Sequence, residues 1–144
     1  MLDNVLIKEG YGWVRFEKDN RVLWFKGYLT GNSENDIMDY FSKANGNLTI
    51  SLISKFVSNL KGNFAFIWKY RDYVIASVDR INSIPIFYTD GDILIGNNAP
   101  ILKESRTFEV NNNAALQIAM SGYTLGKSTL FDGLYQLTAG SCLL

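Results

Sequence analysis

A run of apolar side chains, Phe64–Trp68, constrains the fold more than any other part of this 144-residue chain. In an extended strand, Phe64, Phe66 and Trp68 point to one side, and the alanine and isoleucine between them point to the other. Both faces of such a strand are apolar, so both need cover from other elements. The run therefore predicts a central strand packed in a layered structure.

Three hairpins are predicted where β-branched and aromatic residues flank polar turns. They pair Tyr11–Phe16 with Arg21–Phe25, Phe64–Trp68 with Tyr73–Val78, and Pro85–Tyr88 with Ile93–Ile95. The turns between them contain Lys18-Asp19-Asn20, Tyr70-Arg71-Asp72 and Asp90-Gly91. These hairpins supply most of the predicted strands.

Two helices are predicted between the first and second hairpins. Ser33 and Asp36 have the spacing of a capping box, which would start a helix over about 34–44. Apolar residues recur at i, i+3, i+4 and i+7 in the second helix: Ile53, Phe56, Val57 and Leu60. Gly62 is expected to end that helix as a left-handed residue.

A third helix is predicted after Asn111–Asn113, whose side chains suit an N-cap. Its apolar positions are Ala114, Leu116, Ile118 and Met120. Gly122 would end it. The last segment, Ser141–Leu144, reads as an apolar strand with no terminal loop, so we expect the natural chain to be longer. Together the elements predict one α+β domain over residues 1–144.

Composition excludes several classes of function. The 14 basic and 14 acidic residues balance, so binding along a phosphate backbone has no electrostatic basis. The apolar runs are too short to cross a bilayer, and Asp3, Lys8 and Glu9 interrupt any signal-peptide core, so we expect a cytoplasmic location. Cys142, the single cysteine, can form neither an internal disulfide nor, alone, a zinc site, and is interpreted as a buried structural thiol.

One segment resembles the N-terminal domain of asparagine synthetases and related class II glutamine amidotransferases. In that family a strand G-x-F-A-F-x-x-W/Y precedes a hairpin partner and then a segment R-D-R-x-G-x-x-P-L-Y-Y. The matching residues here are Gly62, Phe64, Ala65, Phe66 and Trp68, followed by Asp79, Arg80, Pro85, Ile86, Phe87 and Tyr88. Val78 replaces the family's arginine. Asn82 replaces its glycine, and because asparagine tolerates a left-handed backbone the turn is expected to persist.

A second match lies toward the C-terminal end of the sequence. Ser128–Leu134 followed by Leu137–Gly140 is similar to the family's G-x-T-L-F-x-G-I and L-P-P-G. The two matching regions together span roughly 62–144, and they occur in the family's order and separation. The resemblance therefore covers over half of the chain.

The N-terminal part departs from the family at its catalytic positions. Active members use an N-terminal cysteine as nucleophile, whereas this chain begins with Met1. Their N-G-E-I-Y-N segment, which supplies oxyanion-stabilising donors and backbone contacts, corresponds to Lys26–Gly31 with only Gly27 retained. The family's substrate-holding Arg-Gly-Pro sequence is absent from this chain. The resemblance thus implies a degenerate site at Met1, Lys26, Gly27 and Tyr28, with no catalytic residue.

The fold implied by the resemblance is the four-layer αββα sandwich of N-terminal nucleophile hydrolases. Such hydrolases use their own α-amino group as general base. The lack of histidine is therefore compatible with the fold, although it excludes the imidazole base of most serine and cysteine hydrolases. The implied function is a catalytically inactive, glutaminase-like scaffold domain of an asparagine synthetase-like enzyme, which forms amides with ATP.

The implied partner is a C-terminal synthetase domain of the same chain, with a homodimer as a second option and neither nucleic acid nor a membrane expected. ATP and magnesium would belong to that further domain, and no cofactor or metal is expected in residues 1–144. Two alternatives stay open. One is an active glutamine amidotransferase with unusual N-terminal processing, and the other is a stand-alone binding or dimerisation module.

The second part of the first motif is expected to be structural. Asp79 and Arg80 are interpreted as a buried or interface ion pair that fixes the turn before Pro85. Asn82 and Tyr88 complete this structural motif.

Overall fold

The strand predicted over Phe64–Trp68 lies at the centre of a five-stranded sheet. It is β4 (Gly62–Tyr70), and the sheet order is β2-β3-β4-β5-β9. The other strands are β2 (Val14–Lys18), β3 (Arg21–Leu29), β5 (Tyr73–Val78) and β9 (Cys142–Leu143). All neighbours pair antiparallel, as hairpin connections require. The predicted central position of this strand is confirmed.

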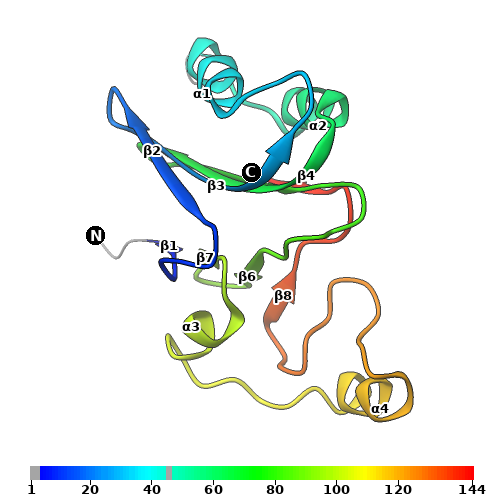
Figure 1. Ribbon diagram of the computed structural model, residues 1–144. Helices are drawn as coiled ribbons and strands as arrows, with labels where there is room; N and C mark the ends of the chain where they lie inside the picture. Colours follow the sequence, from blue (N-terminus) through cyan, green and yellow to red (C-terminus); the bar gives the residue numbers. More distant parts are fainter. Residues whose placement is uncertain (1–3, 45–46) are drawn as a thin grey trace. The chain divides into compact units, whose positions relative to one another are not determined.

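The computed structural model describes residues 4–44 and 47–144 (Figure 1). The chain divides into two compact units, one of residues 9–84 and 139–144 and the other of the residues up to Lys8 and of Pro85–Thr138. The first unit holds the five-stranded sheet and the second holds a four-stranded sheet. Over the described ranges there are two sheets and four helices, which confirms the α+β class.

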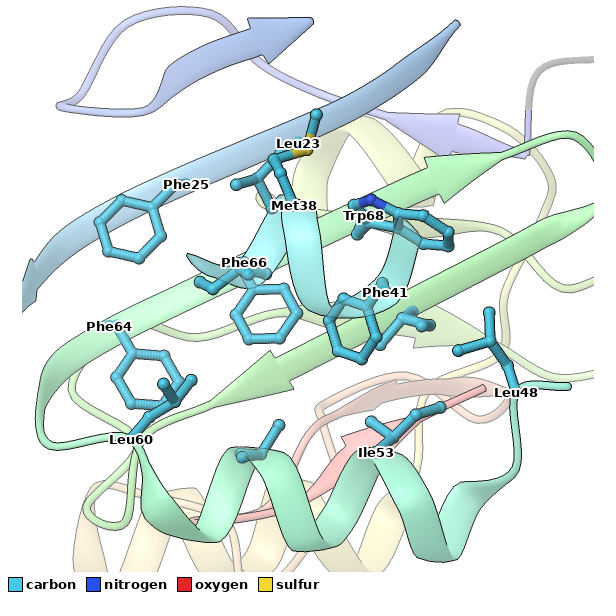
Figure 2. Packing of buried hydrophobic residues seen from close by; sticks show 13 residues of the cluster. Leu23, Phe25, Met38, Phe41, Leu48, Ile53, Leu60, Phe64, Phe66 and Trp68 are labelled. Atoms are coloured by element: carbon cyan, nitrogen blue, oxygen red, sulfur yellow. The ribbon is translucent and has the colours of Figure 1, made fainter. Parts of the chain in front are cut away.

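Two helices cover one face of the five-stranded sheet, α1 (Glu34–Lys43) and α2 (Ile50–Asn59) (Figure 1). Figure 2 shows Phe41 of α1 directed at the rings of β4. Its ring centroid lies 6.1 Å from that of Phe66 and 5.5 Å from that of Trp68. Aromatic pairs at such distances contribute about 0.5–1.5 kcal/mol beyond the burial of apolar area. These contacts attach the helical layer to the central strand.

The start of α1 follows the prediction, and the end of α2 does not. Ser33 and Asp36 form the capping box, with the Ser33 amide donating to Asp36 Oδ2 at 2.7 Å. α2 ends because Leu60 turns to an extended conformation (φ −71°, ψ 135°). Gly62 is the first residue of β4, with φ +136°, and does not cap the helix. The prediction was wrong because the helix ends at Asn59, three residues before the glycine.

In the first hairpin, the first strand begins and ends later than predicted, and the second strand is longer than predicted. The first strand begins at Val14, because Tyr11 has a φ of +54° and the Trp13 amide donates to the Gly10 carbonyl at 3.1 Å. Asp19 and Asn20 form the turn with φ values of +51° and +59°. Positive φ at both positions is the requirement of a two-residue type I′ hairpin turn. The turn therefore excludes Lys18, which belongs to the strand.

β3 and β4 approach each other closely at one end, where each strand has a glycine with positive φ. A Cβ added to Gly27 would lie 2.0 Å from the Asn63 carbonyl oxygen, and one added to Gly62 would lie 2.1 Å from the Tyr28 carbonyl oxygen. Any other residue at either position would collide with backbone. The two glycines thus permit the pairing of Gly27 with Phe64.

The four-stranded sheet has the order β1-β7-β6-β8. Its strands are β1 (Val5–Leu6), β7 (Ile95–Gly96), β6 (Phe87–Thr89) and β8 (Leu134–Gln136). The predicted pairing of the third hairpin is confirmed by the register of Tyr88 opposite Ile95, although both strands are shorter than predicted. β1 joins parallel to β7, a contact that the sequence pattern did not indicate.

The four-stranded unit contains α3 (Ala99–Lys103) and α4 (Asn112–Ser121). α4 has the predicted ends, since the Asn111 side chain accepts from the Ala114 amide at 2.9 Å and Gly122 has a φ of +82°. Of its apolar positions only Ala114 is buried, while Leu116 and Met120 are exposed. Positions spaced by two lie on opposite sides of a helix. α3 was not predicted.

No helix within residues 4–44 and 47–144 combines the length and the apolar character that crossing a membrane would need.

We predict that Gly27→Ala lowers the free energy of unfolding by about 3 kcal/mol, because the new Cβ collides with the β4 backbone. Gly31→Ala is the matched control. Gly31 also has a positive φ, +78°, but an added Cβ there meets no atom within 4 Å. The control should lose only about 1 kcal/mol. Chemical denaturation measures both, and equal losses would contradict the close approach.

Candidate functional site

The predicted degenerate positions within the described chain lie in the second half of β3. Lys26, Gly27 and Tyr28 pair with Ala65, Phe64 and Asn63 of β4. Met1 lies outside the described residues. Tyr28 is 60% exposed, and the Lys26 side chain runs past Gly12, where an added Cβ would lie 3.6 Å from Lys26 Cε. These side chains lie along a strand surface.

Phe64 connects the degenerate segment to Asp79. Its backbone pairs with Gly27 on one side of β4. On the other side its amide donates to Asp79 Oδ2 at 3.0 Å, and its carbonyl accepts from the Asp79 amide at 3.0 Å. Two motifs that are about 50 residues apart in the sequence are therefore separated by one strand in the fold.

The Asp79 carboxylate is buried and hydrogen-bonded on both oxygens, with only 2% of the residue exposed. Oδ1 accepts from the amides of Ile81 at 2.9 Å and of Ser83 at 3.3 Å. Oδ2 accepts from the Ser83 hydroxyl as well as from the Phe64 amide. These bonds close the turn after β5 around one side chain.

The backbone of Asp79 extends the same network. Its carbonyl accepts from the Asn82 amide at 3.1 Å and from the Gly140 amide at 2.7 Å. Asn82 has a φ of +52°, so the predicted left-handed conformation at this position is confirmed. Asp79 therefore joins the start of β4, its own turn and the segment that leads into β9.

Hydrogen bonding determines the charge of Asp79. Burial by itself raises the pKa of the carboxyl, but the bonds from the Ser83 side chain and from the amides of Ile81, Ser83 and Phe64 outweigh it, and the pKa is lowered below its ordinary value of 3.8. The group is anionic near neutral pH. Because donors occupy both of its oxygens, it is poorly suited to accept a proton from a substrate.

Arg80 lies outside the carboxylate network. Its guanidinium is exposed and donates from Nη2 to the Ser58 carbonyl, at the end of α2, at 2.8 Å. The structure therefore replaces the predicted Asp79–Arg80 ion pair with two separate sets of backbone contacts. The two side chains do not pair because they point in different directions: that of Asp79 points into the sheet and that of Arg80 points toward the solvent.

A cavity of about 320 Å³ adjoins this turn. Its lining comes from the end of α2, the start of β4 and the turn after β5, and includes Lys61, Asn63, Asp79, Arg80 and Gly140. The exposed charged groups among them are the cations of Lys61 and Arg80. Such a lining is better suited to binding an anion than to catalysing hydrolysis, since it includes neither a thiol nor an imidazole.

The remaining motif residues, Pro85 and Tyr88, belong to the four-stranded unit. Pro85 is exposed just before β6. Tyr88 lies opposite Tyr135 of β8, with ring centroids 5.5 Å apart. Burial first, and then the neighbouring Tyr135, raises the pKa of the Tyr88 hydroxyl. This position is a packing contact between two strands.

Cys142 lies in β9 opposite Ser77 and packs against the cluster of buried residues under α1 and α2. It is half-buried, so the predicted full burial was too strong. Burial raises the pKa of its thiol, which disfavours the reactive thiolate. Over the described ranges no three His, Cys, Asp or Glu side chains gather in a way that could hold a metal.

Sequence reasoning missed Ser83 and Gly140 as partners of Asp79. A partial signal was present, because an aspartate side chain often accepts from the amide two residues later, here that of Ile81, and so starts the turn that contains Ser83. Gly140 gave no such signal, since its contact spans 61 residues and depends on the sheet.

No protein-family model matches this chain, and no curated protein matches it.

We predict that Asp79→Asn lowers the free energy of unfolding by about 3 kcal/mol near pH 7, since an amide cannot replace a charged acceptor for several amides. A depressed pKa contributes stability above the unfolded value and loses it as pH falls through the folded value. The difference between the two proteins should therefore be constant above about pH 5 and shrink below about pH 4.

Denaturation at several pH values measures this, with Asp39→Asn as control. Asp39 is exposed and forms a 3.6 Å ion pair with Lys18. The Asp39→Asn substitution should change the free energy of unfolding by at most about 0.5 kcal/mol. A difference for Asp79→Asn that does not depend on pH would contradict a charged, hydrogen-bonded carboxylate.

Proposed function

We propose that this chain is a catalytically inactive glutaminase-like domain of an asparagine synthetase-like protein and serves as a scaffold for an ATP-dependent, amide-forming synthetase domain. The observation that carries the proposal is the contact of Gly27, Phe64 and Asp79 across β4. Phe64 and Asp79 come from the first segment that resembles the family, and Gly27 is the residue retained in the degenerate segment. In this chain their contacts serve to hold strands and a turn together.

Three features support the absence of glutaminase activity. Lys26 stands where the family has a neutral amide that stabilises the oxyanion, and loss of one such donor costs about 10²- to 10³-fold in rate. Cys142, the single cysteine, lies in β9 with a raised pKa. Asp79 is saturated by hydrogen bonds from Phe64, Ile81 and Ser83.

The proposal includes the four-layer αββα arrangement. Its support within the five-stranded unit is the sheet face opposite to α1 and α2, where Ala65, Ile67 and Ala76 are fully buried. A sheet with apolar residues on both faces needs a layer on each. An αββα sandwich supplies helices on one face and a second sheet on the other.

The partner in this proposal is the synthetase domain of the same protein, in the cytoplasm. ATP and magnesium would bind to that domain, and residues 1–144 would contribute no cofactor ligand. A homodimer is compatible with the same scaffold role.

A second candidate is a binding module that acts without a synthetase. It is favoured by the exposed apolar side chains on and after α4: Leu116, Met120, Tyr123 and Leu125. Apolar residues gathered on an exposed surface are typical of sites where another protein binds. The two candidates differ in the identity of the partner.

The purified chain is predicted to release glutamate from glutamine at the rate of the blank. Intact-mass measurement after incubation should show no acyl adduct. Lys26→Asn restores the family's side chain at one position and should also be inactive, since a nucleophile is still missing. Glutamate release above the blank that a single substitution abolishes would overturn the inactive assignment.

Sequencing the reading frame that encodes this chain tests the scaffold role separately. We expect this frame, or a neighbouring frame, to encode a synthetase domain with an S-G-G-x-D-S pyrophosphate loop, and we expect that domain to co-purify with this chain. A well-behaved monomer with no such partner would favour the binding module.

A further inference from the structure

A separate cavity of about 550 Å³ lies in the four-stranded unit, and the proposed scaffold role does not use it. Its apolar lining residues are Phe87, Pro100, Leu130, Phe131 and Leu134. They come from strands β6 and β8, from helix α3 and from the loop before β8. This volume is within the range of about 300–1,000 Å³ that small-molecule sites occupy.

The walls of this cavity are fixed independently of any ligand. Asn98 caps α3 by accepting from the Ile101 amide at 3.2 Å, and Leu102 of the same helix is fully buried. On the opposite wall the Thr129 hydroxyl donates to the Leu134 carbonyl at 2.7 Å and accepts from the Phe131 amide at 3.2 Å. A preformed cavity lowers the ordering cost of binding.

Two opposite charges stand side by side at the edge of the cavity. Lys103 and Glu104 are consecutive residues at the end of α3, and both line it. The Lys103 ammonium lies 4.3 Å from the ring centroid of Phe131, across the cavity wall. Lys103 is the last residue of α3 and Glu104 is its C-cap, so the two charges reach the cavity lining from adjacent backbone positions.

We propose that this cavity binds a free amino acid with a large apolar side chain. The α-carboxylate would contact Lys103, the α-ammonium would contact Glu104, and the side chain would lie against Phe131 and Leu134. A simple carboxylic acid would be attracted by Lys103 and repelled by Glu104. A simple amine would be attracted by Glu104 and repelled by Lys103. Only a ligand with both charged groups on one carbon, which also carries an apolar body, complements all three features.

The affinity expected for such a site is modest. Both charged groups are exposed to water, which weakens their attraction to a ligand. An amino acid of about 12 heavy atoms, at the binding energy per atom usual for drug-sized ligands, gives a dissociation constant of about 2 mM. Contact between ligand and protein should therefore be measured by a method suited to weak binding.

The test is a nuclear magnetic resonance titration of the whole chain, labelled with ¹⁵N, with L-phenylalanine and L-tryptophan. Saturable amide shifts are expected within Ala99–Glu104 and Thr129–Leu134. 3-Phenylpropionate and phenethylamine, which each lack one charge, should bind about fivefold more weakly. Lys103→Gln and Glu104→Gln should each weaken phenylalanine binding by a similar factor, while Lys55→Gln on α2 should not change it.

Three results would overturn the proposal. The first is the absence of saturable shifts from either amino acid at about ten times the expected dissociation constant. The second is binding of 3-phenylpropionate as tight as that of phenylalanine, which would identify a site for carboxylic acids. The third is full binding by Lys103→Gln or Glu104→Gln. Both variants change exposed side chains, and measuring their melting temperatures would show whether they are folded.

Discussion

Asp79, through its buried carboxylate and its backbone carbonyl, holds three separate pieces of the five-stranded unit together. One oxygen accepts from the start of β4 and both accept from the turn after β5, while its backbone carbonyl accepts from Gly140. A buried charge without such donors would be costly, because its desolvation is not compensated. Here the hydrogen bonds exceed the effect of burial, and the pKa is lowered. The ionised side chain therefore joins the start of β4 to the turn after β5, and the backbone carbonyl of the same residue joins that turn to the segment before β9.

The close approach of β3 and β4 is the second condition of this arrangement. Gly27 and Gly62 remove the Cβ atoms that would otherwise meet backbone oxygens at about 2 Å. Phe64 can then pair with Gly27 and bond to Asp79 at the same time. On the sheet face that α1 and α2 cover, contacts between the rings of Phe41, Phe66 and Trp68 fix the helical layer (Figure 2). The segments that resemble a glutaminase are thus used for packing and turn closure, which is the basis of the scaffold proposal.

The candidate site was predicted from the sequence only in its parts. The glycine at 27, the left-handed asparagine at 82 and the aspartate at 79 could all be singled out, because each has a local conformational or motif signal. Their spatial relation through Phe64 could not, since it depends on strand register. The partner assigned to Asp79 was wrong for the same reason. An adjacent arginine seemed the natural partner by sequence, whereas the fold supplies amides and a serine from the turn.

Local chemistry in the sequence was sufficient to determine the strand with two apolar faces, the capping box at Ser33, the asparagine cap of α4 and the pairing of the hairpins, because each depends on residues within a few positions. Tertiary structure decided what depends on distant residues. It placed β1 beside β7, exposed Leu116 and Met120, and brought Lys103 to the ring of Phe131. Which side of α4 is buried, and which charges share a cavity, follow from the packing of whole elements, and no local periodicity encodes that packing.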